Sequence, residues 1–418
     1  MTVRGRTRRI VSALVAIATA LSLCAAPFGA RRASAQTPVT LTWFMWSASQ
    51  PEVTAWQHDA ALVTQKYPWI HINFQTAAWA QYWTKLQSEA ATGQLQDIIS
   101  LQMQRTPGFS ASFRPLNPYM RSSKFDIKSF DPGIVQALSY GGAVRALPYD
   151  FGPIVVYYNK AMFAKYHVPY PTFKWTYQTF AKDVQLLSHP AAQEYGINAN
   201  PTIDDWLPFA LSAGAHYLTP DGKLNLTDPK LAQAFQQYAQ FDYKDGASPA
   251  QSIPLENYTY AQFQAGGIAM FLDGPWDMIN LKNSVKFPMG IATIPSVNGD
   301  SVSQTAGSGF GVSTTTKDPQ DAWLAISVLT SPAAEQYLAT SGRAFSARVA
   351  QQPYWYKNAV PGAQQVLSYQ QTHSVPFLTT KNWNEVETLI QQYGTDVVND
   401  GSSAAKALAT VQQQANSQ

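Results

Sequence analysis

From residue 39 onward, short apolar runs alternate with longer segments of helical periodicity. Runs at 39–44, 70–74 and 97–101 are predicted strands, and the segments 51–66 and 79–92 between them carry apolar residues at helical spacing. A strand–helix–strand–helix–strand order predicts parallel strands joined by right-handed crossovers. The pattern therefore predicts an α/β fold.

The same alternation continues to the C-terminus, without an internal repeat or a low-complexity tract. Further strands are expected at 144–147, 154–158, 195–198, 268–272 and 287–293. Further helices are expected at 177–187, 204–213, 230–243, 258–265, 318–329, 333–340, 385–397 and 404–414.

One stretch places a large aromatic side chain at the end of a strand. Gly266 and Gly267 end a short helix, and the uninterrupted apolar run 268–272 is typical of a strand buried on both faces. Asp273-Gly274-Pro275 then breaks the strand, so Trp276 follows its carboxyl end, where open α/β sheets bind ligands. The pattern leaves two interpretations open, a platform for a ligand and a core tryptophan under a loop.

Residues 266–276 also match a known signature. They resemble the G-x-x-A-M-x-x-x-G-P-W motif of extracellular solute-binding proteins of ABC importers, in the sugar-binding, maltose-binding-protein-like family 1. Residues 147–160 resemble the family's crossing between lobes, which ends in Tyr-Asn-Lys. Residues 307–313 and 341–348 resemble two further family segments, so the resemblance covers essentially the whole mature chain in the family's order.

The resemblance implies an α/β, two-lobed periplasmic-binding-protein-like fold with a ligand cleft between the lobes. Each lobe is expected to hold a mainly parallel sheet flanked by helices. Gly152 and Pro153 interrupt one crossing and are expected to form a hinge, because proline cannot donate to a strand ladder and glycine tolerates unusual backbone angles. Both lobes are expected to be discontinuous: 36–150 plus 298–345 for the first, and 151–297 plus 346–418 for the second.

The resemblance also implies a set of ligand-binding residues. Trp276 and Trp206 are expected to stack on sugar faces, while Asp150, Gln104 and Arg105 are expected to hydrogen-bond sugar hydroxyls. Gln104 stands where the family has the aspartate of an Asp-Arg pair, and the alternative for Arg105 is a solvated loop residue. Four more residues are expected in the cleft: Tyr149, Trp46, Phe310 and Arg343.

Adjacent carboxylates at Asp204 and Asp205 allow two interpretations. A carboxylate pair with nearby aromatic residues is what a glycoside hydrolase uses. Acids at a helix start also complement the helix dipole and cap backbone N–H groups. The capping interpretation is preferred because it explains both residues through their position alone.

Together these features predict a binding protein without enzymatic activity, which captures a sugar, expected to be an oligosaccharide, and delivers it to the permease subunits of an ABC transporter. One alternative is an extracellular carbohydrate-active hydrolase that uses Asp150 or Asp204 and Asp205. Another is a binding protein for a non-sugar solute such as a polyamine or an iron chelate. Because few acids are predicted in the cleft, a polycation is the less favoured solute.

The first 35 residues have the features of a secretory signal peptide. Arginines at positions 4, 6, 8 and 9 precede an apolar run from 10 to 26, and Ala33-Ser34-Ala35 is an A-x-A cleavage site. The sequence therefore predicts an exported protein, periplasmic or associated with the cell surface. The single cysteine, Cys24, follows Leu23 where a lipobox has a small residue, so a lipid anchor is the less favoured alternative.

Without this leader the chain is slightly acidic. Removing its six arginines from the 29 basic residues leaves 23 against 26 acidic residues, a net charge of −3, so nucleic acid is not an expected partner. Charged residues make up 13% of the chain, about half the usual share, which suggests adaptation to an acidic exterior. The 12 Trp, 21 Tyr and 20 Phe suit a sugar-binding surface and a large core equally.

Other chemistries lack their motifs. Six scattered histidines and a cysteine confined to the leader give no metal-ligand spacing, so neither a metal nor a cofactor is expected. No G-x-S-x-G nucleophile motif is present. The chain is expected to act as a monomer.

Overall fold

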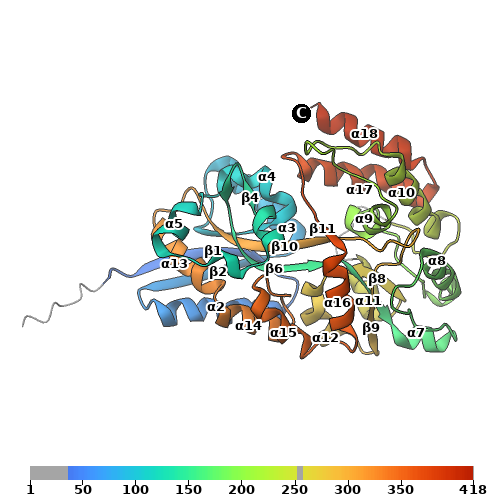
Figure 1. Ribbon diagram of the computed structural model, residues 1–418, viewed down its shortest axis with the longest axis horizontal. Helices are drawn as coiled ribbons and strands as arrows, with labels where there is room; N and C mark the ends of the chain where they lie inside the picture. The colour runs from blue at the N-terminus through green and yellow to red at the C-terminus, as the bar shows by residue number, and fades with distance from the viewer. Residues whose placement is uncertain (1–35, 252–257, 418) are drawn as a thin grey trace, which may run out of the picture. The chain divides into compact units, whose positions relative to one another are not determined.

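The computed structural model describes residues 36–251 and 258–417, and two β-sheets organise them (Figure 1). The first has six strands in the order β11-β10-β3-β1-β2, with β6 paired to β10. Strands β2 and β3 both run parallel to β1, as the alternation predicts. Its strands are β1 (Val39–Trp46), β2 (Ile70–Ala77), β3 (Ile98–Gln102), β6 (Leu147–Pro153), β10 (Ser303–Val312) and β11 (Ser374–Pro376).

Local sequence signals fix the first crossover helices. Helix α2 (Gln50–Lys66) begins where the Ser49 side chain accepts a hydrogen bond from the Glu52 backbone N–H. Helix α3 (Trp79–Thr92) ends at Gly93, whose φ of 68° lies in the left-handed region that glycine adopts without strain. Both bounds agree with the predicted helices to within a residue.

Glycines in β10 allow the neighbouring strand to approach closely. A Cβ atom at Gly307 would lie 2.5 Å from the Asp150 carbonyl oxygen, and one at Gly309 would lie 2.6 Å from that of Leu147. Asp150 and Leu147 both belong to β6, which pairs with β10. These two glycines are therefore required by the close approach of an adjacent strand, and Gly307 also lines the cavity described below.

The second sheet differs from the prediction of a mainly parallel sheet. It has three strands, β7 (Val155–Asn159) between β8 (Met270–Asp273) and β9 (Met289–Ala292), and both neighbours run antiparallel to β7. The predicted strand at 195–198 is wrong as well, since Tyr195 forms only an isolated bridge with Ile268. A separate two-stranded hairpin joins β4 (Ser139–Tyr140) and β5 (Ala143–Val144).

A single residue joins the two sheets at the first crossing. Strand β6 continues through Gly152 and Pro153, so the predicted interruption at these two residues is wrong, and only Ile154 separates β6 from β7. Gly152 is required by close packing, because a Cβ there would lie 2.4 Å from the Pro275 side chain. The second connection, from β9 to β10, spans residues 293–302.

Helices flank both sheets, and the C-terminal pair, α17 and α18, packs on α10 (Figure 1). None of the helices in the described ranges is both long and apolar enough to cross a membrane. The remaining helices are α4 (Thr106–Phe109), α5 (Asn117–Ser123), α6 (Pro132–Ala137), α7 (Lys160–Lys165), α8 (Tyr177–Leu186), α9 (Ile203–Ser212), α10 (Pro229–Tyr243), α11 (Tyr258–Ala265), α12 (Met278–Ser284), α13 (Pro319–Leu329), α14 (Pro332–Ser341), α15 (Gln352–Tyr356), α16 (Ala363–Thr372), α17 (Trp383–Asp400) and α18 (Ala404–Asn416).

Candidate ligand-binding site

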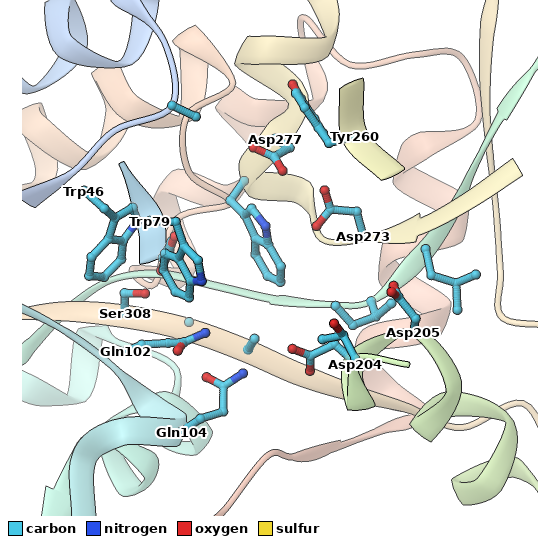
Figure 2. Close-up of a pocket in the computed structure, with 18 of the residues that line it drawn as sticks. Trp46, Trp79, Gln102, Gln104, Asp204, Asp205, Tyr260, Asp273, Asp277 and Ser308 are labelled. Carbon is cyan, nitrogen blue, oxygen red and sulfur yellow. The ribbon is translucent and has the colours of Figure 1, made fainter. Parts of the chain in front are cut away.

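A cavity of about 310 Å³ is lined by residues of both sheets (Figure 2). Trp46, Gln102 and Asp273, which line it, are the last residues of β1, β3 and β8. Strand ends of α/β sheets are where such folds place their ligands, because loops and helix starts converge there. The cavity is therefore the candidate binding site.

Three indoles, together with Tyr260 and Phe271, form the aromatic part of its wall. Trp46 and Trp79 meet edge to face with ring centroids 5.1 Å apart, and Figure 2 shows them side by side. Trp276 lies in the 3₁₀ turn η5 (Pro275–Asp277) and is partly exposed. Trp79 is 36% exposed and was not predicted as a site residue, although it follows the carboxyl end of β2 as Trp276 follows that of β8.

Buried amides supply polar groups without a partner. Gln104 lies in the 3₁₀ turn η1 (Met103–Arg105) and is 1% exposed. Within the described residues, neither amide atom of Gln104 has a hydrogen-bond partner, and the Gln102 amide oxygen also lacks one. A buried polar group left unpaired costs about 1–3 kcal/mol, so both glutamines are poised to bond a ligand. The predicted position of Gln104 in the site agrees with this geometry.

Arg343 joins two carboxylates beneath the cavity. Its Nε lies 3.1 Å from Glu52 Oε1 and its Nη1 lies 3.6 Å from Asp150 Oδ2, while the guanidinium stacks 4.7 Å over the Trp56 ring. Burial raises the pKa of Asp150 to about 7, and the charge of Arg343 opposes that shift. Asp150 and Arg343 both line the cavity, as predicted.

Four further carboxyls also line the cavity, and Figure 2 shows three of them, Asp204, Asp205 and Asp273, on the side away from Trp46. Asp204 and Asp205 lie in the first turn of α9, as the capping interpretation predicts, although no side chain caps that helix. Asp273 and Asp277 stand on either side of the Gly-Pro-Trp turn. The expectation of few acids in the cleft is wrong.

Burial and mutual repulsion act together on these carboxyls. Burial raises the pKa of Asp204 to about 7, and the charge of Glu387 adds to the shift. Burial and then the charge of Asp204 raise the pKa of Asp205 well above its usual value. Burial and then Asp277 do the same to the pKa of Asp273. Burial thus favours the protonated, neutral form of these three carboxyls, and a positive charge brought next to them would favour the ionised form.

Trp206 lies in the core and not at the cavity, contrary to the prediction. It is fully buried, its ring stacks on Phe235 with centroids 4.6 Å apart, and its Nε1 donates to the Pro201 carbonyl oxygen at 3.1 Å. Asp204 and Asp205, on the preceding positions of α9, face the cavity. Each helical residue turns about 100° from the last, so Trp206 faces away from them.

Tyr149 and Phe310 are core residues as well, contrary to the prediction. Their rings stack with centroids 4.5 Å apart, and both side chains are fully buried. The pairing of β6 with β10 shifts between Ser308 and Gly309, so Tyr149 is the extra residue of a β-bulge. The bulge turns Tyr149 and Phe310 onto the same core-facing side, which strand alternation could not reveal.

Arg105 ties its loop to a C-terminal helix. Its Nη2 lies 2.6 Å from Glu387 Oε2, it also bonds Asn384, and its guanidinium stacks 4.4 Å over the Trp83 ring. Both partners belong to α17, and Arg105 does not line the cavity. Neither the ligand role nor the solvated loop position agrees with this placement, because the side chain is 11% exposed.

The two β-sheets are flanked by helices, and their strand ends line one cavity. This is the architecture of two-lobed solute-binding proteins. The family model described as bacterial extracellular solute-binding protein matches residues 60–361, and the chain belongs to that family. This confirms the resemblance inferred from residues 266–276. A Brucella abortus binding protein is 22% identical over 242 residues, which are 54% of this chain and 56% of that protein. The chain thus spans about half the length of the curated relatives that it matches.

Solved structures agree in fold over most of the chain. An ABC substrate-binding protein of Listeria monocytogenes, in complex with cycloalternan, superimposes with a TM-score of 0.82 at 21% identity, over 91% of this chain and 98% of that one. An ABC transporter solute-binding protein of Thermotoga lettingae, bound with α-D-tagatose, gives 0.81 at 18% identity, over 90% and 99%. The predicted two-lobed α/β fold is confirmed.

Proposed function

We propose that this protein captures a sugar, an oligosaccharide, in the cavity and delivers it to the permease subunits of an ABC transporter. The observation that carries the proposal is the cavity wall, where indoles stand beside buried amides that lack partners among the described residues. Pyranose rings present flat C–H faces that stack on indoles and hydroxyls that bond amides and carboxylates. Related proteins in L. monocytogenes and T. lettingae hold sugars.

We further propose two lobes that close on the ligand, 36–150 plus 298–345 and 151–297 plus 346–418. Support comes from the strands, since β6 belongs to the six-stranded sheet and β7, one residue later, to the three-stranded sheet. Strand β11 of the second proposed lobe pairs with β10 of the first, so the lobes also share a strand contact. Closure would bring the indoles against the ligand and present one conformation to the permease.

Export and monomeric action belong to the same proposal. The predicted signal peptide at 1–35 and Cys24 lie outside the described residues. Cleavage before Gln36 would release the binding domain outside the cytoplasmic membrane. N-terminal sequencing of the secreted chain tests the cleavage site, and a lipid-modified Cys24 at the mature terminus would contradict it.

A ligand screen tests the central proposal. The chain secreted with its own leader is mixed with glucose, maltose, maltotriose, cellobiose and mannobiose, and its melting temperature is followed as concentration rises. A binding sugar should raise the melting temperature progressively, because only the folded state binds it. A rise with spermidine or an iron chelate and with none of the sugars would contradict sugar capture.

Product analysis separates binding from hydrolysis. Prolonged incubation with the bound glycan should leave it intact by chromatography. Sustained release of shorter sugars, abolished by Asp204→Asn or Asp205→Asn, would establish the hydrolase alternative.

Solution scattering with and without the sugar tests closure, for which we expect a smaller radius of gyration with ligand.

A further inference from the structure

The cavity has two chemically different ends. Figure 2 shows Trp46, Trp79 and Gln104 at one end and the carboxyls of Asp204 and Asp205 at the other. Asp273 lies toward the second pair, and Asp277 lies nearer Tyr260, on the other side of Asp273; all four carboxyls line the cavity. We call this second part, made of Asp204, Asp205, Asp273 and Asp277, the acidic end. An occupant that fills the cavity meets an apolar, amide-bearing wall and a strongly acidic one at once.

Neutral donors hydrogen-bond three of the four carboxyls at the acidic end. The Asp273 Oδ1 accepts from the Gly274 backbone N–H at 2.6 Å, and Asp277 Oδ1 accepts from Asn280 Nδ2 at 3.0 Å. Asp204 Oδ1 accepts from Gln304 Nε2 at 3.3 Å. Over residues 36–251 and 258–417, none of the four carboxyls forms an ion pair with a lysine, arginine or histidine.

The positive charge at the cavity is already engaged elsewhere. Arg343, the single lysine or arginine among the described lining residues, pairs with Glu52 and Asp150. Asp150 is 3% exposed, and its Oδ1 has no hydrogen-bond partner within the described residues. Asp150 and Gln104 both line the cavity, so each brings a buried polar atom without a partner among the described residues to its wall. The raised pKa values of Asp204, Asp205 and Asp273 are consistent with an uncompensated excess of carboxyls.

We propose that the sugar carries a protonated amine, and that the ammonium group binds at the acidic end. This inference rests on the proposed function and names its ligand class, an amino sugar. An ammonium group donates three hydrogen bonds and offsets the repulsion among the carboxyls. Trp276, within the turn that carries Asp273 and Asp277, adds an indole face that attracts cations. A neutral sugar would satisfy hydrogen bonds there but would not favour ionisation of the carboxyls whose pKa values burial raises.

A matched series of sugars tests the proposal. Cellobiose, di-N-acetylchitobiose and the glucosamine disaccharide share one β-1,4 backbone and differ at C2 as hydroxyl, acetamide and ammonium. Glucose and glucosamine form a second, smaller pair. Isothermal titration at pH 7 should give the amine-bearing member of each series at least a tenfold lower Kd, since each ~1.4 kcal/mol is a factor of ten.

Single charge removals then locate the ammonium group. Asp205→Asn and Asp277→Asn should each weaken binding of the amine-bearing sugar about tenfold, and weaken a neutral sugar about threefold or less. Asp400→Asn, at an exposed position in α17 outside the cavity, is the matched control and should change neither. Melting temperatures without ligand show whether each variant is folded.

The outcomes separate this inference from the proposed function. Equal or tighter binding of the neutral sugar, or no binding of either amine-bearing sugar, overturns the inference and leaves sugar capture standing. Binding of spermidine with no binding of any sugar overturns both. Binding of calcium that Asp205→Asn and Asp277→Asn abolish, with no preference for the amine, also overturns the inference.

Discussion

Trp276 and Trp206 stand in similar local sequence and end in opposite environments. Each follows or adjoins aspartates at the start of a helical turn, yet Trp276 is partly exposed at the cavity and Trp206 is fully buried. The difference comes from a partner distant in sequence, because Phe235 of α10 covers the Trp206 ring. Local sequence thus places each indole beside aspartates at the start of a helical turn, and tertiary packing decides whether a ligand can reach it.

The largest effect should come from the buried member of this comparison. Trp206→Ala removes a fully buried indole stacked on Phe235 and should lower the free energy of unfolding by about 3–5 kcal/mol. Chemical denaturation measures this loss, and the sugar affinity of the folded fraction should stay near wild type. A stable variant with lost affinity would put Trp206 at the ligand after all.

Acidic pH should stabilise the folded protein through the buried carboxyls that line the cavity. The folded-state pKa of Asp150 and that of Asp204 are raised to about 7, so the folded state binds more protons than the unfolded chain between pH 7 and about 4. The free energy of unfolding should therefore rise, on the order of a few kcal/mol in total, as pH falls through this window. Asp183 and Asp242, each with a pKa raised to about 6 by burial, contribute outside the cavity.

Denaturation at several pH values checks this dependence, and Asp150→Asn should flatten part of it. The asparagine side chain does not titrate, so the pH dependence of the free energy of unfolding in this variant should lack the contribution of Asp150 alone. Greater stability at pH 7 than at pH 5 would contradict the raised pKa values.

Substitution of Trp276, the partly exposed indole, should weaken ligand binding and leave the free energy of unfolding nearly unchanged. Trp276→Ala should weaken sugar binding roughly tenfold to a hundredfold, about 1.4–2.8 kcal/mol, because a stacking surface is lost. Calorimetric titration gives the affinity and denaturation without ligand gives the stability. A collapse of unliganded stability with intact affinity would instead make Trp276 a core residue like Trp206.

The smallest effect is expected for a polar residue of the cavity wall, Gln104, which extends the comparison from indoles to a buried amide. Gln104→Leu replaces a buried amide without a partner among the described residues, so unliganded stability should rise by about 1 kcal/mol. Sugar affinity should fall up to about tenfold, because a hydrogen bond to the ligand is lost. Leu101→Ala, in the fully buried part of β3, is the contrasting control and should lose stability. Unchanged affinity in Gln104→Leu would remove this residue from the site.

Periodicity and turn residues were sufficient for the first three strands and their crossover helices. They were insufficient for the strand directions around β7, because the short apolar runs at 268–272 and 287–293 carry no sign of which way a partner runs. The predicted strand at 195–198 failed for a related reason. Its apolar residues pack under neighbouring elements without a continuous ladder.

The site was predictable where a residue follows a strand end, as with Trp46 and Trp276. Trp79 satisfies the same criterion after β2 and could have been found by applying it to every strand. Tyr149 and Phe310 could not be assigned, because the bulge in β6 exists only in the pairing with β10. Arg105 could not be assigned either, since its partner Glu387 is 282 positions away in the chain.

The one-residue connection at Ile154 has a mechanical consequence. A single residue contributes two soft torsions, and its peptide planes are rigid, so the link acts as a swivel with almost no slack. Its backbone N–H is held by the Gln304 carbonyl oxygen at 3.0 Å, which fixes the position of the pivot against the long strand beside it. At this connection, Ile154 therefore allows β6 and β7 to rotate relative to each other much more readily than to separate along the strands.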